Sequence, residues 1–309
     1  MASKPMSAGP SRDEAWPALP LAEWSATRAT LHMWMQMVGK LRLALTPHLN
    51  HWWEVPLYAS ARGLTTSAIP YRFGNFECEF DFISHALRFT TCRDETRTMA
   101  LAPRSVADFY REFKSTLASL AIDAKIWPMP VEIPDPIRFD QDTVHASYDP
   151  AYANRFWRAL STVDTLCKDF RARFIGKCSP VHFFWGSFDL AATRFSGRRA
   201  PERPGANAID REAYSHEVSS VGWWPGNGGF DAPMFYAYAA PEPAGFRDSK
   251  ILPAEASYNA QLREFLLPYD AVRNSAEPAR AVMDFFQSTY EAAANHGNWD
   301  RAALEKDRS

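Results

Sequence analysis

A proline-rich segment near the middle of the chain constrains the fold more than any other feature. Residues 127–139, WPMPVEIPDPIRF, contain four prolines. Proline has no backbone N–H group and a fixed φ, so this segment can continue neither a helix nor a central strand. We therefore expect residues 127–150 to form a linker. It divides the chain into a first half, residues 16–126, and a second half, residues 151–309.

Each half begins and ends with a segment whose apolar residues have helical spacing. Residues 21–45 and 152–174 carry apolar side chains three or four positions apart, which predicts two long helices. Shorter helices are expected over residues 105–120 and 276–294. On the first long helix His32, Gln36 and Lys40 form a polar row. We interpret this row as the solvent-facing side of the helix.

The segments between the helices predict strands. In residues 76–82 aromatic residues and a cysteine alternate with acidic residues, which is typical of a half-exposed strand. The chain is also rich in large rings, with 11 Trp, 11 Tyr and 21 Phe, and rings favour strands. Further strands are expected within residues 51–59, 179–197, 212–224, 232–239 and 263–269. The predicted fold class is α+β with a mostly antiparallel sheet.

The two halves resemble each other in the order of their elements, which is helix, strands, helix. HWW at 51–53 matches HFF at 182–184, FECEF at 76–80 matches YSHEV at 214–218, and VADFY at 106–110 matches VMDFF at 282–286. An internal duplication would explain these matches, with the halves sharing one core and related by a pseudo-twofold axis. The alternative is that α+β proteins in general share such patterns.

Charge and composition exclude several classes of protein. The net charge is −2, with 34 basic and 36 acidic residues, so there is no basic excess of the kind that nucleic-acid-binding proteins carry. No run of about 18 apolar residues is present, so no membrane span is expected. The first 15 residues lack the apolar core of a secretion signal and are expected to be a disordered tail. Reduced cysteines and a cytoplasmic location are expected, because no CxxC pair occurs. A homodimer is the default expectation from base rates.

Histidines are the first candidates for chemistry, because the motifs of P-loop, dinucleotide-binding, zincin and serine hydrolase proteins are missing. His51 and His182 each open an aromatic segment at matching places, so a pseudo-twofold axis would bring them together. Imidazole suits acid–base catalysis and metal binding near neutral pH. His216 with His182 and one carboxylate would form a three-ligand metal site. The alternative is buried histidines bonded to backbone carbonyls. The sequence identifies no cofactor.

Carboxylates, arginines and aromatic residues complete the candidate site. Asp189 interrupts the apolar segment GSFDLA, and Glu217 follows His216; either carboxylate would orient an imidazole. Arg62 and Arg194 would hold an anionic group of a substrate. The alternatives are a structural ion pair or turn cap for Asp189 and solvated loops for the arginines. Four further residues would line a ligand cleft or belong to the core: Trp53, Trp185, Tyr214 and Trp224.

Three long segments carry a resemblance to a known family. NHWWEVPLYASARGLTTS, SPVHFFWGSFDLAATRFSGR and AYSHEVSSVGWWPG resemble a bacterial family catalogued only as a domain of unknown function. The resemblance extends from about Trp16 to Glu305. It implies a single-family protein without appended modules, and it implies no reaction, cofactor or catalytic residue.

We therefore form three hypotheses about function. The first is an enzyme that acts on a small organic molecule with an anionic group, by histidine acid–base or metal-assisted chemistry. The second is a non-catalytic binding protein for an apolar or aromatic ligand. The third is a structural or interaction protein.

Overall fold

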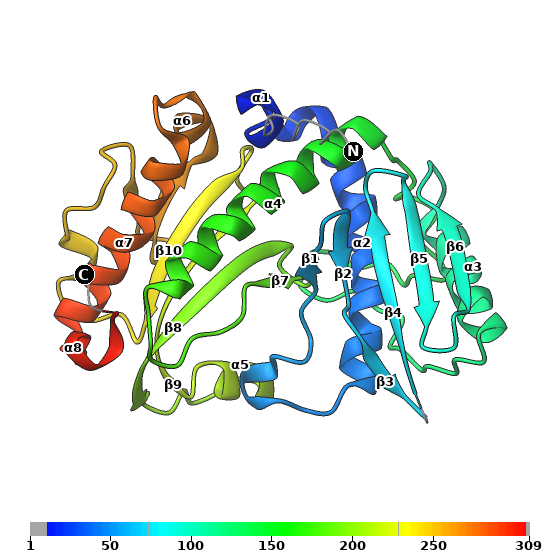
Figure 1. Ribbon diagram of the computed structural model, residues 1–309, viewed down its shortest axis with the longest axis horizontal. Helices are drawn as coiled ribbons and strands as arrows, with labels where there is room; N and C mark the ends of the chain where they lie inside the picture. The colour runs from blue at the N-terminus through cyan, green and yellow to red at the C-terminus, as the bar shows by residue number, and fades with distance from the viewer. Residues whose placement is uncertain (1–10, 73, 228, 307–309) are drawn as a thin grey trace, which may run out of the picture.

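The computed structural model describes residues 11–72, 74–227 and 229–306. Its strands form two six-stranded antiparallel sheets, and long helices pack against both (Figure 1). The predicted α+β class with antiparallel sheet is confirmed.

The N-terminal sheet is built from strands of the first half in the order β1-β2-β4-β5-β6, with β3 paired to β4. The alternation predicted over residues 76–82 corresponds to β4, in which Cys78 and Phe80 are buried. The strands are β1 (Tyr58–Ala59), β2 (Gly63–Thr65), β3 (Ile69–Tyr71), β4 (Gly74–Asp81), β5 (Ala86–Thr91) and β6 (Thr96–Ala100). Helix α3 (Val106–Ser119) follows, capped by the side chain of Ser105.

The C-terminal sheet has the order β11-β12-β10-β9-β8-β7. Its strands are β7 (His182–Phe184), β8 (Asp189–Arg199), β9 (His216–Trp224), β10 (Met234–Ala240), β11 (Ser257–Asn259) and β12 (Glu264–Pro268). Three short helices accompany it: α5 (Ala208–Ala213), α6 (Tyr269–Asn274) and α8 (Arg301–Leu304), with the 3₁₀ turn η2 (Phe246–Asp248).

Helices α4 (Pro150–Ala172) and α7 (Pro278–His296) lie across one face of the C-terminal sheet (Figure 1). The side chain of Asp149 accepts hydrogen bonds from the first backbone N–H groups of α4 and fixes where the helix begins. Phe156 of α4 stacks on Trp223 of β9, with ring centroids 6.1 Å apart. Aromatic and aliphatic residues thus fill this side of the sheet, while the other side is left to the cavity described below.

Helix α2 (Leu21–Leu45) runs behind the N-terminal sheet in Figure 1 and packs beside α3, where Trp34 stacks on Phe109 at 4.4 Å. The interpretation of its polar row as a solvent face is wrong, because His32, Gln36 and Lys40 are all at most 4% exposed. His32 Nε2 lies 2.9 Å from the carbonyl oxygen of Trp185. A helix surrounded by protein must satisfy its polar side chains internally rather than in water.

The proline-rich segment contains no helix or strand before α4 begins, and it packs against α2. The side-chain amide of Gln36 donates to the carbonyl of Val131 and its oxygen accepts from the N–H of Val131, both at 2.8 Å. Leu57 and Phe183 also exchange two backbone hydrogen bonds, which join β1 of one sheet to β7 of the other. Buried residues of both halves therefore form one continuous core.

Two local predictions are wrong. Residues 51–59 do not form one strand: His51 and Trp52 have φ of 61° and 60° within the 3₁₀ turn η1 (Asn50–Trp52), and pairing starts only at Tyr58. HWW and HFF therefore occupy different kinds of element, and the pseudo-twofold axis stays a prediction.

The expected disordered tail is also wrong for residues 12–15, which form helix α1 (Arg12–Ala15) with a capping box between Ser11 and Glu14. Residues 1–10 lie outside the described residues.

Candidate functional site

A cavity of about 700 Å³ lies on the face of the C-terminal sheet that α4 and α7 leave free. Strand alternation selects the residues that line it. Along β8, Asp189, Ala191, Thr193 and Phe195 face the cavity, while the residues between them point toward the helices. Strands β9, β10 and β12, helix α5, the proline-rich segment and the turn at η1 supply the other walls.

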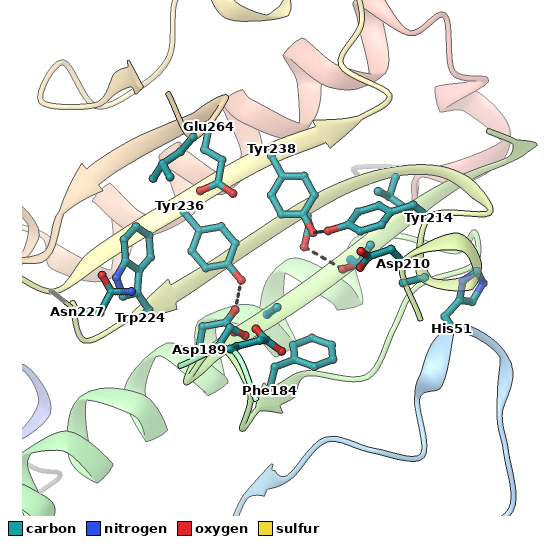
Figure 2. A pocket seen from close by; sticks show the side chains of 18 of the residues that line it. His51, Phe184, Asp189, Asp210, Tyr214, Trp224, Asn227, Tyr236, Tyr238 and Glu264 are labelled. Carbon is teal, nitrogen blue, oxygen red and sulfur yellow. Dashed lines mark hydrogen bonds between the residues drawn. The ribbon is translucent and has the colours of Figure 1, made fainter. Parts of the chain in front are cut away.

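Asp189 is the most buried acid of the cavity, at 8% exposure. The hydroxyl of Tyr236 donates a hydrogen bond to one carboxylate oxygen of Asp189, and the hydroxyl of Ser187 donates to the other (Figure 2). Burial raises the pKa of Asp189, and these two hydroxyl groups act in the opposite direction.

Gly222 of β9 makes the contact between Tyr236 and Asp189 possible. It pairs with Ala191 of β8 on one side and with Tyr236 of β10 on the other. A Cβ atom at this position would lie 2.3 Å from the hydroxyl oxygen of Tyr236 and 2.3 Å from the carbonyl oxygen of Leu190. The tyrosine therefore crosses β9 over a position where no side chain fits.

Three further acids face the same cavity: Glu132 from the proline-rich segment, Asp210 from α5 and Glu264 from β12. Burial, followed by the charge of Asp189, raises the pKa of Glu264 to about 7. Glu132 is exposed as a residue, but its carboxylate lies against Gly186, and this local desolvation, followed by the charges of Asp189 and Asp210, raises its pKa. Within the part of the chain described, no ion pair or hydrogen bond stabilises the Glu264 carboxylate. This end of the cavity has more negative charge than its own partners neutralise.

Aromatic and hydroxyl side chains form the floor. Trp224 packs edge-on against Phe230 at 5.6 Å and also contacts the ring of Tyr236 at 5.6 Å. The hydroxyl oxygens of Tyr214 and Tyr238 are 3.1 Å apart. Figure 2 shows both tyrosines lying between the Asp189–Glu264 end and His51. A ligand here would meet ring faces and edges together with a limited set of hydroxyl groups.

Basic groups gather at the other end of the cavity. His51 lines the wall, and its Nδ1 donates to the carbonyl oxygen of Glu212 at 2.9 Å. Its Nε2 therefore accepts a hydrogen bond from the ammonium group of Lys177 at 2.5 Å. The ring of His216 lies 5.6 Å from that of His51. Burial and then the charge of Lys177 lower the pKa of His51.

The structure brings together five of the residues that the sequence indicated, in the wall of one cavity: His51, Trp53, Asp189, Tyr214 and Trp224. His216 is adjacent, through its contact with His51. Glu217 points to the other face of β9, where it pairs with Arg198 at 2.6 Å.

His182 lies behind the cavity wall. It is 1% exposed, and its ring contacts Trp53 at 6.1 Å and Phe184 at 5.4 Å, both of which line the cavity. Neither ring nitrogen has a hydrogen-bond partner within the described residues. Burial lowers the pKa of His182 to about 3, so the ring stays neutral.

The two arginines and Trp185 lie elsewhere. Arg62 pairs with Asp81 of the N-terminal sheet at 2.6 Å. Arg194 points toward α4, with its guanidinium 3.5 Å from the centre of the Phe170 ring. Trp185 is buried against α2. None of the three lines the cavity.

Among the polar residues of the cavity that sequence reasoning missed are three acids and two tyrosines: Glu132, Asp210, Glu264, Tyr236 and Tyr238. Tyr236 and Tyr238 are two positions apart in a predicted strand, so they share a face, and that spacing was a usable signal. Nothing local in the sequence distinguishes the three acids from surface acids.

The described residues contain no group of three or more His, Cys, Asp or Glu side chains arranged to hold a metal ion. This removes the geometric basis of the proposed three-ligand site. Of the helices in the described residues, none is long and apolar enough to cross a membrane.

Fold and cavity together define an α+β protein with two antiparallel sheets and an acidic, aromatic cavity on one of them. The chain belongs to Family of unknown function (DUF5996), whose model matches residues 16–306. The resemblance drawn from the three sequence segments is thereby confirmed. No curated protein and no solved structure matches the chain.

Proposed function

We propose that this protein binds a small organic molecule that carries a protonated amine on an aromatic or apolar body. The observation that supports this most is Glu264, a half-buried carboxyl group without a partner in the described residues that shares a cavity with Asp189. Two neighbouring acids in a partly dry site repel each other, and a cation between them relieves that repulsion.

The rest of the cavity suits the same kind of ligand. The rings of Trp224, Phe230 and Tyr236 stand beside the acids, and aromatic rings attract organic cations as well as apolar groups. A volume of about 700 Å³ falls within the range of ordinary metabolite pockets, roughly 300–1,000 Å³.

Charge argues against the anionic substrate that the sequence suggested. Among the described residues that line the cavity there is no lysine or arginine, whereas four are acidic. Arg62 and Arg194, which were expected to hold the anion, contact other groups. A ligand whose only charge is negative would face Asp189 and Glu264 without compensation.

Binding can be tested through tryptophan fluorescence, since Trp53 and Trp224 lie in the cavity wall. Primary amines with aromatic or alkyl bodies would be titrated against the matching alcohols at pH 7.5. We expect saturable binding of amines only. Glu264→Gln should weaken it by about tenfold, the order of one charge-assisted hydrogen bond. Glu255→Gln, at an exposed acid outside the cavity, is the matched control. Equal binding of amines and alcohols would refute the proposal.

Acid–base catalysis on the bound amine is the second candidate function. It is favoured by the pKa of about 7 for Glu264, since a general acid or base works best when its pKa lies near the working pH. The test is to follow each bound amine by NMR in the presence of protein. Conversion by the wild type that is lost in Glu264→Gln would support catalysis, and unchanged spectra for every bound amine would refute it.

A further inference from the structure

We infer that the ligand is a zwitterion, whose anionic group lies at the His51 end of the cavity while its amine lies at the Asp189–Glu264 end. This inference rests on the proposed binding of an amine and adds a second recognition point to it. The chemical class is an amino acid or amino-acid-like molecule with its two charges well separated.

The ammonium group of Lys177 is the first observation. It lies 2.5 Å from Nε2 of His51, 5.3 Å from the centre of the Trp53 ring and 4.9 Å from that of the Phe195 ring. All three of these residues line the cavity. Lys177 thus contributes a positive charge directly behind the wall at this end.

The protons of Lys177 are not used up by its neighbours. His51 accepts one of them, because its Nδ1 hydrogen is held by the carbonyl of Glu212. No acidic side chain of the described residues forms an ion pair with Lys177. Lys177 is an exposed residue and does not itself line the cavity, so it would attract an anion at the His51 end through its charge rather than through a contact that the cavity wall provides. The backbone holds the lysine in place, since Phe195 N–H donates to the carbonyl of Lys177 at 3.0 Å.

Two acids lie near this end, Asp210 and Glu212. The Glu212 carboxylate pairs with His48 at 2.9 Å and accepts a hydrogen bond from the backbone N–H of His51 at 3.2 Å. Asp210 accepts a hydrogen bond from the side-chain amide of Asn207 at 2.9 Å, at the start of α5. Its carboxylate forms no ion pair with Lys177 or His51 in the described residues.

The two charged ends are separated by a neutral polar strip. Figure 2 shows Tyr214 and Tyr238 between His51 and the Asp189–Glu264 end. Thr193 and Ser220, whose hydroxyl oxygens are 2.9 Å apart, lie on the same floor. A zwitterion that spans this strip would place its ammonium group beside Asp189 and Glu264 and its anionic group on the side of Lys177. Complementarity of this kind contributes more to specificity than to raw affinity.

The test uses matched probes, namely straight-chain ω-amino acids with three to eight methylene groups, together with the alkylamine and the alkanoic acid of each length. Dissociation constants would be measured for the wild type, Lys177→Met and Lys125→Met. Lys125 is an exposed lysine outside the cavity, so its variant controls for the loss of surface charge. Thermal unfolding of each variant would show that it is folded.

We expect at least one ω-amino acid to bind about tenfold or more tightly than the amine of the same length. Lys177→Met should abolish this advantage without weakening the binding of the amine, and Lys125→Met should preserve it. If amines bind but no carboxylate improves binding, the zwitterion is refuted while amine binding stands. If no amine binds, the proposed function fails; Lys177-dependent binding of the alkanoic acids would then show that the anion site exists alone.

Discussion

Replacing Glu264 with glutamine should make the protein more stable at alkaline pH, although it weakens ligand binding. Burial and Asp189 raise the pKa of Glu264 from 4.5 to about 7. Such a shift corresponds to about 3 kcal/mol, which residual contact with water reduces to about 2 kcal/mol. Because the folded state binds this proton more tightly than the unfolded state, the contribution to stability is complete below pH 4.5 and is lost as the pH rises through about 7.

Glutamine has the same shape and no charge to desolvate, so the variant escapes this loss. We expect its free energy of unfolding in urea to exceed that of the wild type by about 2 kcal/mol at pH 8.5 and by little at pH 5. The control variant Glu255→Gln changes an exposed acid and should show no such pH dependence. A Glu264→Gln variant that is less stable than the wild type at pH 8.5 would mean that the carboxylate has a stabilising partner, and the argument for an unpaired acid would fail.

Three further outcomes are expected. Gly222→Ala should lower the free energy of unfolding by about 1–3 kcal/mol, because the new Cβ overpacks the sheet, and should displace the Tyr236 hydroxyl from Asp189. A crystal structure would detect the displacement, and a titration would detect the loss of amine binding. His182→Phe should stabilise the protein by about 1 kcal/mol in urea unfolding and leave ligand affinity intact, since both ring nitrogens lack partners in the described residues; a destabilised variant would contradict this. Hydrogen bonds to Glu54 and then Glu212 raise the pKa of His48, so its stabilisation is complete below pH 6.5 and fades as the pH rises. Thermal unfolding of His48→Gln should therefore differ from that of the wild type at pH 5.5 and converge with it at alkaline pH.

The sequence predicted those elements in which a local pattern and the final environment agree. Strand β4 has one face in the core and one toward solvent, so its alternation is visible. Residues 30–42 of helix α2 have no solvent face, because every one of them is buried, and periodicity cannot say whether a polar side such as that of His32 and Gln36 will meet water or partners. The turn at His51 and Trp52 was also hidden, since nothing in the residue types reveals two successive positive φ angles.

The residues of the candidate site could likewise be predicted only where a local pattern agrees with the final environment. Asp189 could be predicted because a charged residue in an apolar strand requires an explanation. Glu132 and Glu264 could not, because one lies in an irregular segment and the other begins a short strand near the edge of the sheet. Only the pairing order of the C-terminal sheet, and the position of the proline-rich segment beside it, bring these acids together.

The hydrogen bonds between Gln36 and Val131 have a consequence for how this protein can be divided. They anchor the proline-rich segment immediately before Glu132, and His51 and Trp53 reach the same cavity from the first half. A fragment that starts at residue 151 would keep the whole C-terminal sheet yet lose three side chains of the recognition surface. If the cavity binds the proposed ligand, its specificity would therefore require both halves of the chain, and exchanging one half between relatives would change the cavity wall.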